Sequence, residues 1–230
     1  MSMKPMIIVG CGGSGGKIVQ LLRRELELQL RRKGWTEGIP KAWQLVYVDT
    51  PSTQEQGIPG VPTVPLRDYI SVSGGFDLYS DVITSLFNSY AGMEDRFSGW
   101  LPEKEGVTVP LTDGAGQMRA VGRATAFSSM GHLGQRLQAA YEATITNSAE
   151  LAQLYNALYP GAEPASSLSA DQNPYIFVVS SLAGGTGAGI FMDVCDVFRA
   201  CDDDLSNRIS GVLFSAEVFA NLSNESGLQP

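Results

Sequence analysis

The chain has 230 residues, 43% of them hydrophobic, which is enough to bury the core of one large domain. Its net charge of −8 repels the phosphates of nucleic acids, so we expect no nucleic-acid partner. The three cysteines cannot all pair and have no metal-like spacing, which favours reduced thiols and a cytoplasmic location. The uncharged stretch 175–192 is too rich in Gly, Ser and Thr for membrane insertion, and we find no signal peptide.

The first elements in chain order predict a βαβ unit. Apolar residues 6–9 are typical of a buried strand, and residues 10–16, with the sequence GCGGSGG, of a glycine-rich turn. Residues 17–33 then have apolar side chains at helical spacing, and a second strand is expected over 44–48. Strand, turn, helix and strand in this order imply a parallel sheet with a right-handed crossover.

The middle of the chain predicts a long loop followed by helices. Residues 50–75 are rich in Pro, Gly, Ser and Thr, which is typical of a loop, and residues 77–100 are weakly helical. The segment 114–127, GAGQMRAVGRATAF, repeats the pattern of a small-residue turn followed by a helix. Helical spacing then continues to about residue 159, with a break near 146–148.

The last third of the chain predicts two further strands around a helix. A surface loop over 160–174 precedes a strand over 175–179. The glycine-rich segment 183–189, AGGTGAG, leads into a helix over 190–201, and a last strand follows over 209–215. Strands that alternate with helices in this way predict an α/β fold.

Three glycine-rich segments, 10–16, 114–116 and 184–189, therefore adjoin strands or helix starts. In an open parallel sheet such turns lie at the carboxyl ends of the strands, where ligands bind. A helix N-terminus leaves backbone N–H groups unpaired, and glycine lets those groups approach a phosphate. One glycine turn alone is usually only a tight connection, and the P-loop pattern GxxxxGK(S/T) is not satisfied at Lys17. The joint occurrence of three predicts a site for a di- or triphosphate.

Four segments resemble one family. Residues 183–189 fit the tubulin signature, (S/A/G)-G-G-T-G-(S/A)-G, at every position. Residues 10–17, GCGGSGGK, resemble the first glycine loop of FtsZ, with Lys17 where FtsZ usually has Asn. DTP at 49–51 is similar to the NTD of the second loop, and 114–126 looks like the third loop and its helix. The chain is thus identified as a member of the tubulin/FtsZ superfamily, and its long inserts resemble those of divergent bacterial tubulin-like proteins.

This resemblance implies a domain over residues 1–230 that binds GTP or GDP with Mg²⁺, on a Rossmann-like, doubly wound, mostly parallel sheet with helices on both faces. The nucleotide contacts that it implies are Gly12, Gly13, Ser14, Gly15, Gly16, Lys17, Asp49, Ala115, Gly116, Ala183, Gly184, Gly185, Thr186 and Gly187. By the same likeness Asp49 and Asp113 would hold Mg²⁺ through water. The alternative for both is an ordinary turn or capping aspartate.

The resemblance also implies that hydrolysis is completed in trans. Copies of the chain would associate head to tail into filaments, and each copy would complete its neighbour's site. The family's catalytic acidic residues come from a loop after the central helix, and we identify no such loop within residues 1–230. We therefore expect this chain to be the N-terminal part of a longer protein, and we assign no catalytic residue.

Two alternatives remain open. The first is a Rossmann-type NAD(P)-binding oxidoreductase, which a glycine loop after a strand favours. In that class the acidic residue follows the glycine loop by about 20 positions, whereas Asp49 lies 34 residues beyond Gly15. The second is a nucleotide-dependent scaffold that does not hydrolyse its ligand.

Overall fold

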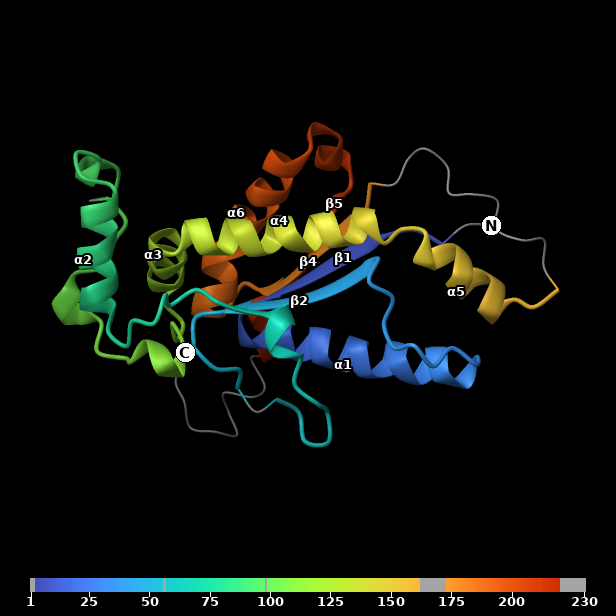
Figure 1. Cartoon of the computed structure of the whole chain (residues 1–230). Helices are drawn as coiled ribbons and strands as arrows, with labels where there is room; N and C mark the ends of the chain where they lie inside the picture. The colour runs from blue at the N-terminus through green and yellow to red at the C-terminus, as the bar shows by residue number, and fades with distance from the viewer. Residues whose placement is uncertain (1–2, 56, 98, 162–172, 220–230) are drawn as a thin grey trace.

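Five parallel strands form a single sheet in the order β3-β2-β1-β4-β5 (Figure 1). The computed structural model describes residues 3–55, 57–97, 99–161 and 173–219. The strands are β1 (Met6–Cys11), β2 (Trp43–Asp49), β3 (Tyr69–Ser71), β4 (Tyr175–Ser181) and β5 (Ile209–Phe214). The chain runs outward from β1 to β2 and β3, and then outward again from β4 to β5. This reversal confirms the predicted doubly wound α/β fold and creates a topological switch point between β1 and β4.

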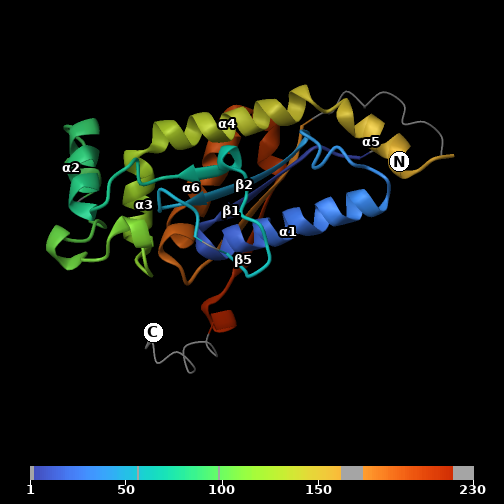
Figure 2. The same cartoon turned by 60° about the horizontal axis from the view of Figure 1, so that its bottom comes forward.

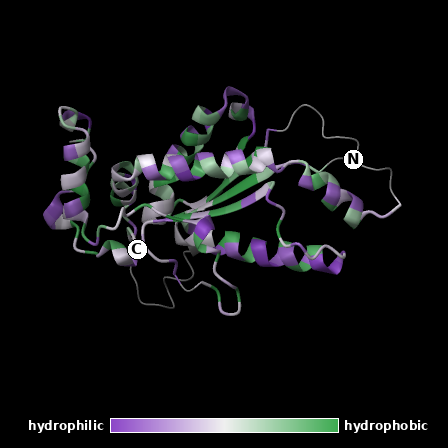
Figure 3. Ribbon diagram, viewed as in Figure 1, coloured by the Kyte–Doolittle hydropathy of each residue, from purple (hydrophilic) through white to green (hydrophobic). Residues whose placement is uncertain are grey.

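Helices cover both faces of the sheet, as the sequence predicted (Figures 1 and 2). They are α1 (Gly12–Arg32), α2 (Tyr79–Ser89), α3 (Arg119–Ser128), α4 (Met130–Thr146), α5 (Glu150–Leu158) and α6 (Gly185–Cys201). Helix α1 lies on one face, and α4 and α6 lie on the other. Figure 3 shows hydrophobic strands between helices whose outer surfaces are largely hydrophilic.

The alternation of side chains along β1 explains the two layers of core. Ile7 and Val9 are fully buried in the cluster beneath α4 and α6, whereas Ile8 packs with Val19 of α1 on the opposite face. Successive strand residues point to opposite faces, so a strand covered on both sides reads as a continuous apolar run. The short apolar run that begins β1 in the sequence is therefore the signature of a central strand.

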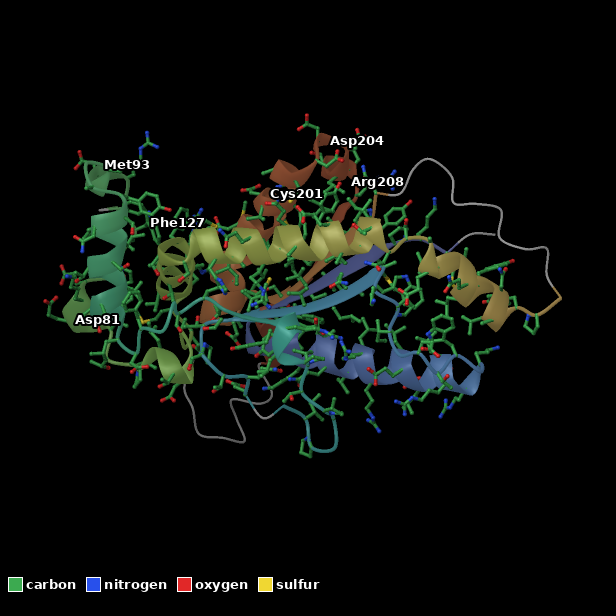
Figure 4. All side chains as sticks on the ribbon, in the orientation of Figure 1. Asp81, Met93, Phe127, Cys201, Asp204 and Arg208 are labelled. Atoms are coloured by element: carbon green, nitrogen blue, oxygen red, sulfur yellow. The ribbon has the colours of Figure 1, made fainter. Side chains whose placement is uncertain are left out.

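A smaller cluster stands beside the end of the sheet, between α2 and α3 (Figure 1). Its buried members include Tyr79 of α2 and Val121 of α3, together with Leu111, which precedes α3 in the chain. Phe127, labelled in Figure 4, packs against the cluster from the end of α3, with its ring 6.2 Å from that of Phe97. Because the segment after Leu111 leads directly into residues 114–116, this cluster fixes the position of the third glycine-rich segment.

Several boundaries differ from the sequence prediction. Helices α1 and α6 begin at Gly12 and Gly185, so most of both predicted glycine turns is helix. Glycine is a poor helix former, and periodicity alone therefore missed these first turns. Strand β3 lies within the segment predicted to be a loop. The sequence did not predict this strand, because three residues are too few to show the alternation of apolar and polar side chains. The helix break expected near 146–148 is confirmed by the end of α4, and most of the expected loop 160–174 lies outside the described residues.

None of the helices in the described part of the chain combines the length and the apolar composition that crossing a bilayer requires.

Candidate functional site

A pocket of about 250 Å³ lies at the carboxyl ends of β1, β2 and β4, next to the topological switch point. It is formed where the first turns of α1 and α6 meet the loop that precedes α3. The residues that line it are Cys11, Gly12, Gly13, Ser14, Asp49, Glu55, Asp113, Gly114, Ala115, Gly116, Ser181, Gly184, Gly185, Thr186 and Gly187. All three predicted glycine-rich segments contribute to this one pocket.

The first turns of α1 and α6 are in direct backbone contact. Gly12 has a φ of +71°, and a Cβ atom there would lie 2.7 Å from the backbone nitrogen of Gly187. Only glycine satisfies both the left-handed conformation and this close approach. The close contact brings the positive ends of two helix dipoles to the same pocket.

Neither helix start is capped by a side chain. The N-cap positions are Cys11 and Gly184, neither of which makes a side-chain capping bond, and neither first turn carries an acidic residue. The first N–H groups of a helix have no intrahelical partner. Apart from the Gly185 N–H, which donates to the Gly116 carbonyl, these groups are available to an anionic ligand, which is the chemistry that helix N-termini favour.

The third segment is held against the start of α6. Gly114 and Gly116 have φ values of +93° and +55°, which few residues other than glycine adopt. The backbone N–H of Gly185 donates to the carbonyl oxygen of Gly116 over 2.7 Å. The loop and the helix thus form one side of the pocket together.

A buried polar network lies beneath the pocket. The carboxylate of Asp49 is 4% exposed, and its two oxygens accept hydrogen bonds from the Tyr47 hydroxyl at 2.7 Å and the Thr50 N–H at 2.8 Å. Burial raises the pKa of Asp49, and these hydrogen bonds oppose the rise. The hydroxyls of Thr50 and Thr186 are 2.7 Å apart, which ties the end of β2 to the first turn of α6.

The pocket also contains three carboxylates: Asp49, Glu55 and Asp113. The Glu55 carboxylate is half-exposed and lies 3.7 Å from the ammonium group of Lys17. Among the described residues, no group of three or more His, Cys, Asp or Glu side chains is arranged to hold a metal ion. An anion in this pocket would therefore need a cation of its own to offset the carboxylates.

A family profile described as "Tubulin like" matches residues 7–229. The chain belongs to the tubulin-like family. No curated protein matches the sequence significantly. The match covers nearly the whole chain, in agreement with the four segments that carry the resemblance in the sequence. In this tubulin-like chain residues 183–184 of the signature segment belong to the connection between β4 and α6, and residues 185–189 form the start of α6.

Eleven of the residues predicted for the site line the pocket: Gly12, Gly13, Ser14, Asp49, Asp113, Ala115, Gly116, Gly184, Gly185, Thr186 and Gly187. The other four, Gly15, Gly16, Lys17 and Ala183, lie outside the lining. A Cβ atom on Gly15 would overlap the carbonyl oxygen of Val179, and one on Gly16 would overlap the ring of Tyr47. The absence of a side chain at these two positions therefore allows α1 to pack closely against the sheet.

Sequence reasoning missed four lining residues: Cys11, Glu55, Gly114 and Ser181. Cys11 and Gly114 lie inside the predicted segments 10–16 and 114–116 but were not named as contacts, and Ser181 lies two residues before the signature segment 183–189. Glu55 lies in the loop after β2 and carries no pattern in the sequence that marks it.

Proposed function

We propose that this tubulin-like chain is a GTP-binding domain whose pocket accepts the phosphates of GTP or GDP. The observation that carries the proposal is the convergence of two uncapped helix starts and a glycine loop on one pocket at the switch point. Backbone N–H groups at such positions recognise phosphates without any basic side chain. This suits a pocket in which Lys17, the nearest predicted cation, pairs with Glu55 instead of lining the cavity.

The size of the pocket supports the phosphate tail as the part of the nucleotide that it holds. Sites for whole ligands of drug size usually measure about 300–1,000 Å³, whereas this pocket measures about 250 Å³. A Cβ atom on Gly184 would meet nothing within 4 Å, so the backbone there faces open space. The ribose and base would extend beyond the lining residues.

We further propose that Mg²⁺ accompanies the nucleotide near Asp49 and Asp113. Mg²⁺ usually keeps several waters and binds through one or two carboxylates together with the phosphates. Asp49 is only 4% exposed and its oxygens already accept hydrogen bonds from Tyr47 and Thr50, so we propose that it acts through water. The ion would neutralise phosphate charge beside the carboxylates. The negative charge of Glu55, which lines the same pocket, would also attract the cation.

Self-association is the remaining part of the proposal. The domain would form part of a longer cytoplasmic protein whose copies associate head to tail, with hydrolysis completed in trans. A heterologous contact of this kind generates filaments when the rotation between copies does not close a ring. A site completed in trans predicts that phosphate release per molecule of protein rises with protein concentration. Release per molecule that is independent of concentration would favour a site complete within one copy, and the absence of release would favour the non-hydrolysing scaffold.

The strand order keeps a dinucleotide-binding function as the second candidate. The order β3-β2-β1-β4-β5 is shared with NAD-binding Rossmann domains, in which an acidic residue after the glycine loop bonds the ribose. Asp49 ends β2, but its carboxylate is buried and engaged by Tyr47 and Thr50. A ribose hydroxyl must reach the carboxylate to donate to it, and Asp49 is only 4% exposed, so this geometry favours a phosphate site over a dinucleotide site.

A single substitution at Gly184 tests the proposal. Its φ of −83° and ψ of 160° suit any residue, and its Cβ direction is open. Gly184→Val should therefore fold normally, and it adds bulk at a residue that lines the pocket. We expect the wild type to bind fluorescent GTP in the presence of Mg²⁺, and the variant to bind it at least about tenfold more weakly, a loss of about 1.4 kcal/mol.

Gly131→Ala is the matched control, because its Cβ on α4 would also meet nothing within 4 Å. It should leave GTP binding unchanged. Equal binding of GTP by the wild type and Gly184→Val would contradict the assigned pocket. Tighter binding of NAD than of GTP by the wild type would support the dinucleotide alternative.

A further inference from the structure

A second groove, of about 320 Å³, follows the outer edge of β2 at a distance from the nucleotide pocket. Strand β3 pairs only with residues 47–49, so within the described part of the chain the first half of β2 has no neighbouring strand on that side. Figures 1 and 2 show this half of β2 between α1 and α4. A sheet edge that lacks a neighbour is a template for pairing with another chain.

The backbone of Leu45 faces this open edge. The Val72 N–H donates to the Asp49 carbonyl on the β3 side, whereas the Met6 N–H donates to the Ala42 carbonyl on the β1 side. Backbone groups alternate between the two edges of a strand, so the odd-numbered residues of β2 face outward. The Trp43 N–H is already bonded to the Pro40 carbonyl over 2.8 Å. Leu45 is therefore the residue at which an added strand would pair. Because Leu45 is only 3% exposed in the free protein, the side chains that line the groove would have to move aside for a partner.

The groove is basic, although the protein is acidic overall. Four basic side chains and one acidic side chain line it, in a chain whose net charge is −8. Arg23 and Arg67 both pair with Asp68, over 3.0 Å and 3.6 Å, but the Arg67 side chain is 81% exposed, and Lys41 is also exposed. Arg136 is held by hydrogen bonds to the carbonyls of residues 67 and 69. Arg67 and Lys41 are thus the two exposed cations among the residues that line the groove.

The α4 side of the groove leaves room for side chains of a partner. Ala139 is exposed and Ala143 is half-buried, and both line the groove above the β2 edge. A larger residue at either position would fill that space. The open backbone edge, the excess of positive charge and this space together describe a surface for a strand-forming segment.

We propose that this groove binds an extended, acidic segment of a partner protein. The segment adds to the sheet beside β2, exchanges backbone hydrogen bonds with Leu45, and places carboxylates near Lys41 and Arg67. Strand addition of this type derives affinity from main-chain bonds and specificity from alternate side chains. The proposal is independent of the nucleotide-binding function.

The test uses a fluorescein-labelled peptide in which Glu alternates with Val, titrated into the protein and followed by fluorescence polarisation. We expect saturable binding and slower hydrogen exchange of the Leu45 amide in the complex. Two variants should each weaken binding at least about tenfold: Ala143→Phe, which fills the groove, and the double variant Lys41→Glu/Arg67→Glu, which reverses two exposed charges. The control Arg24→Glu/Lys33→Glu makes the same change of charge on exposed residues of the α1 region and should bind normally.

Peptide chemistry separates strand addition from simple charge attraction. Methylation of the backbone nitrogens along one edge of the peptide should abolish binding, and methylation along the other edge should preserve it. Absence of binding up to about 1 mM peptide, the weak limit of specific affinity, would overturn the proposal. So would equal binding of a peptide with Lys in place of Glu, or unchanged exchange at Leu45. Concentration-dependent dimerisation of the wild type that Ala143→Phe abolishes would identify a second copy as the occupant and would also overturn it.

Discussion

Helices α1 and α6 begin at the same sheet edge on opposite faces, and both start in glycine-rich sequence, yet their glycines have different neighbours. In α1, Gly15 and Gly16 lie against the carbonyl of Val179 and the ring of Tyr47, both in the sheet. In α6, a Cβ atom on Gly185 would lie 2.6 Å from the carbonyl oxygen of Ala115 in the third loop. The glycines of α1 allow that helix to pack closely on the sheet, whereas Gly185 allows α6 to pack closely on the third loop, which lines the pocket.

Few of the glycines in these two segments face open space. A Cβ atom on Gly184 would meet nothing within 4 Å, and one on Gly13 would come no closer than 3.7 Å to Glu55. In contrast, a Cβ atom on Gly189 would lie 2.5 Å from the carbonyl oxygen of Arg119. The number of glycines in such a segment therefore overstates the number of residues that could touch a ligand. Most of them allow the backbones that form the pocket to approach one another.

The largest effect on stability is expected where α1 meets the sheet. In Gly15→Ala the new Cβ overlaps the carbonyl of Val179 and the backbone of Gly10, so α1 must move away from the sheet. We expect a loss of about 1–3 kcal/mol in the free energy of unfolding, measured by urea denaturation. The same substitution at Gly134 of α4 meets nothing within 4 Å and should stabilise the protein by roughly 0.4–1 kcal/mol. Equal effects at the two positions would show that α1 is not closely packed.

A smaller loss is expected where α6 meets the third loop. In Gly185→Ala the new Cβ would lie 2.6 Å and 2.7 Å from the carbonyl oxygens of Ala115 and Gly116. A loop can shift more readily than a strand inside a sheet, so we expect a loss of about 1 kcal/mol. The shift would also disturb the Gly185–Gly116 hydrogen bond and with it the pocket. If Gly185→Ala destabilises the protein as much as Gly15→Ala, the loop is as rigid as the sheet.

The order of elements was predictable from the sequence because each long element has a clear period. The strand beginning at Met6 and the helix through Leu26 are examples, and both follow from apolar spacing. Strand β3 was not predictable, because its three residues are recognisable only by their pairing with β2. The first turns of α1 and α6 were missed because their glycines are placed by contacts across the fold, not by local preference.

The position of the candidate site was predictable for a different reason. Carboxyl ends of parallel strands meet at one edge, so the glycine segments after β1 and β4 had to be close together. The orientation of single residues was not predictable. Lys17 lies one helical turn after Gly13, but it does not line the pocket and pairs with Glu55, which does. Asp49 was expected as a water-mediated ligand of Mg²⁺, and only the structure reveals that Tyr47 and Thr50 occupy both of its oxygens.

The smallest effect is expected from Asp49→Asn, which tests the buried network that joins the end of β2 to the first turn of α6. Burial raises the pKa of Asp49, so the folded protein binds this proton more tightly than the unfolded chain does. The resulting contribution to stability is present below the unfolded pKa and is lost as the pH rises through the folded pKa. An asparagine stays neutral at every pH and can still accept from the Thr50 N–H.

At pH 7 we therefore expect Asp49→Asn to change the free energy of unfolding by at most about 1 kcal/mol, in the stabilising direction. The advantage of the variant should shrink as the pH is lowered toward the ordinary carboxyl range, as measured by urea denaturation at several pH values. A variant that is less stable than the wild type at neutral pH, with a deficit that shrinks on acidification, would mean that the hydrogen bonds to the charged carboxylate outweigh its burial.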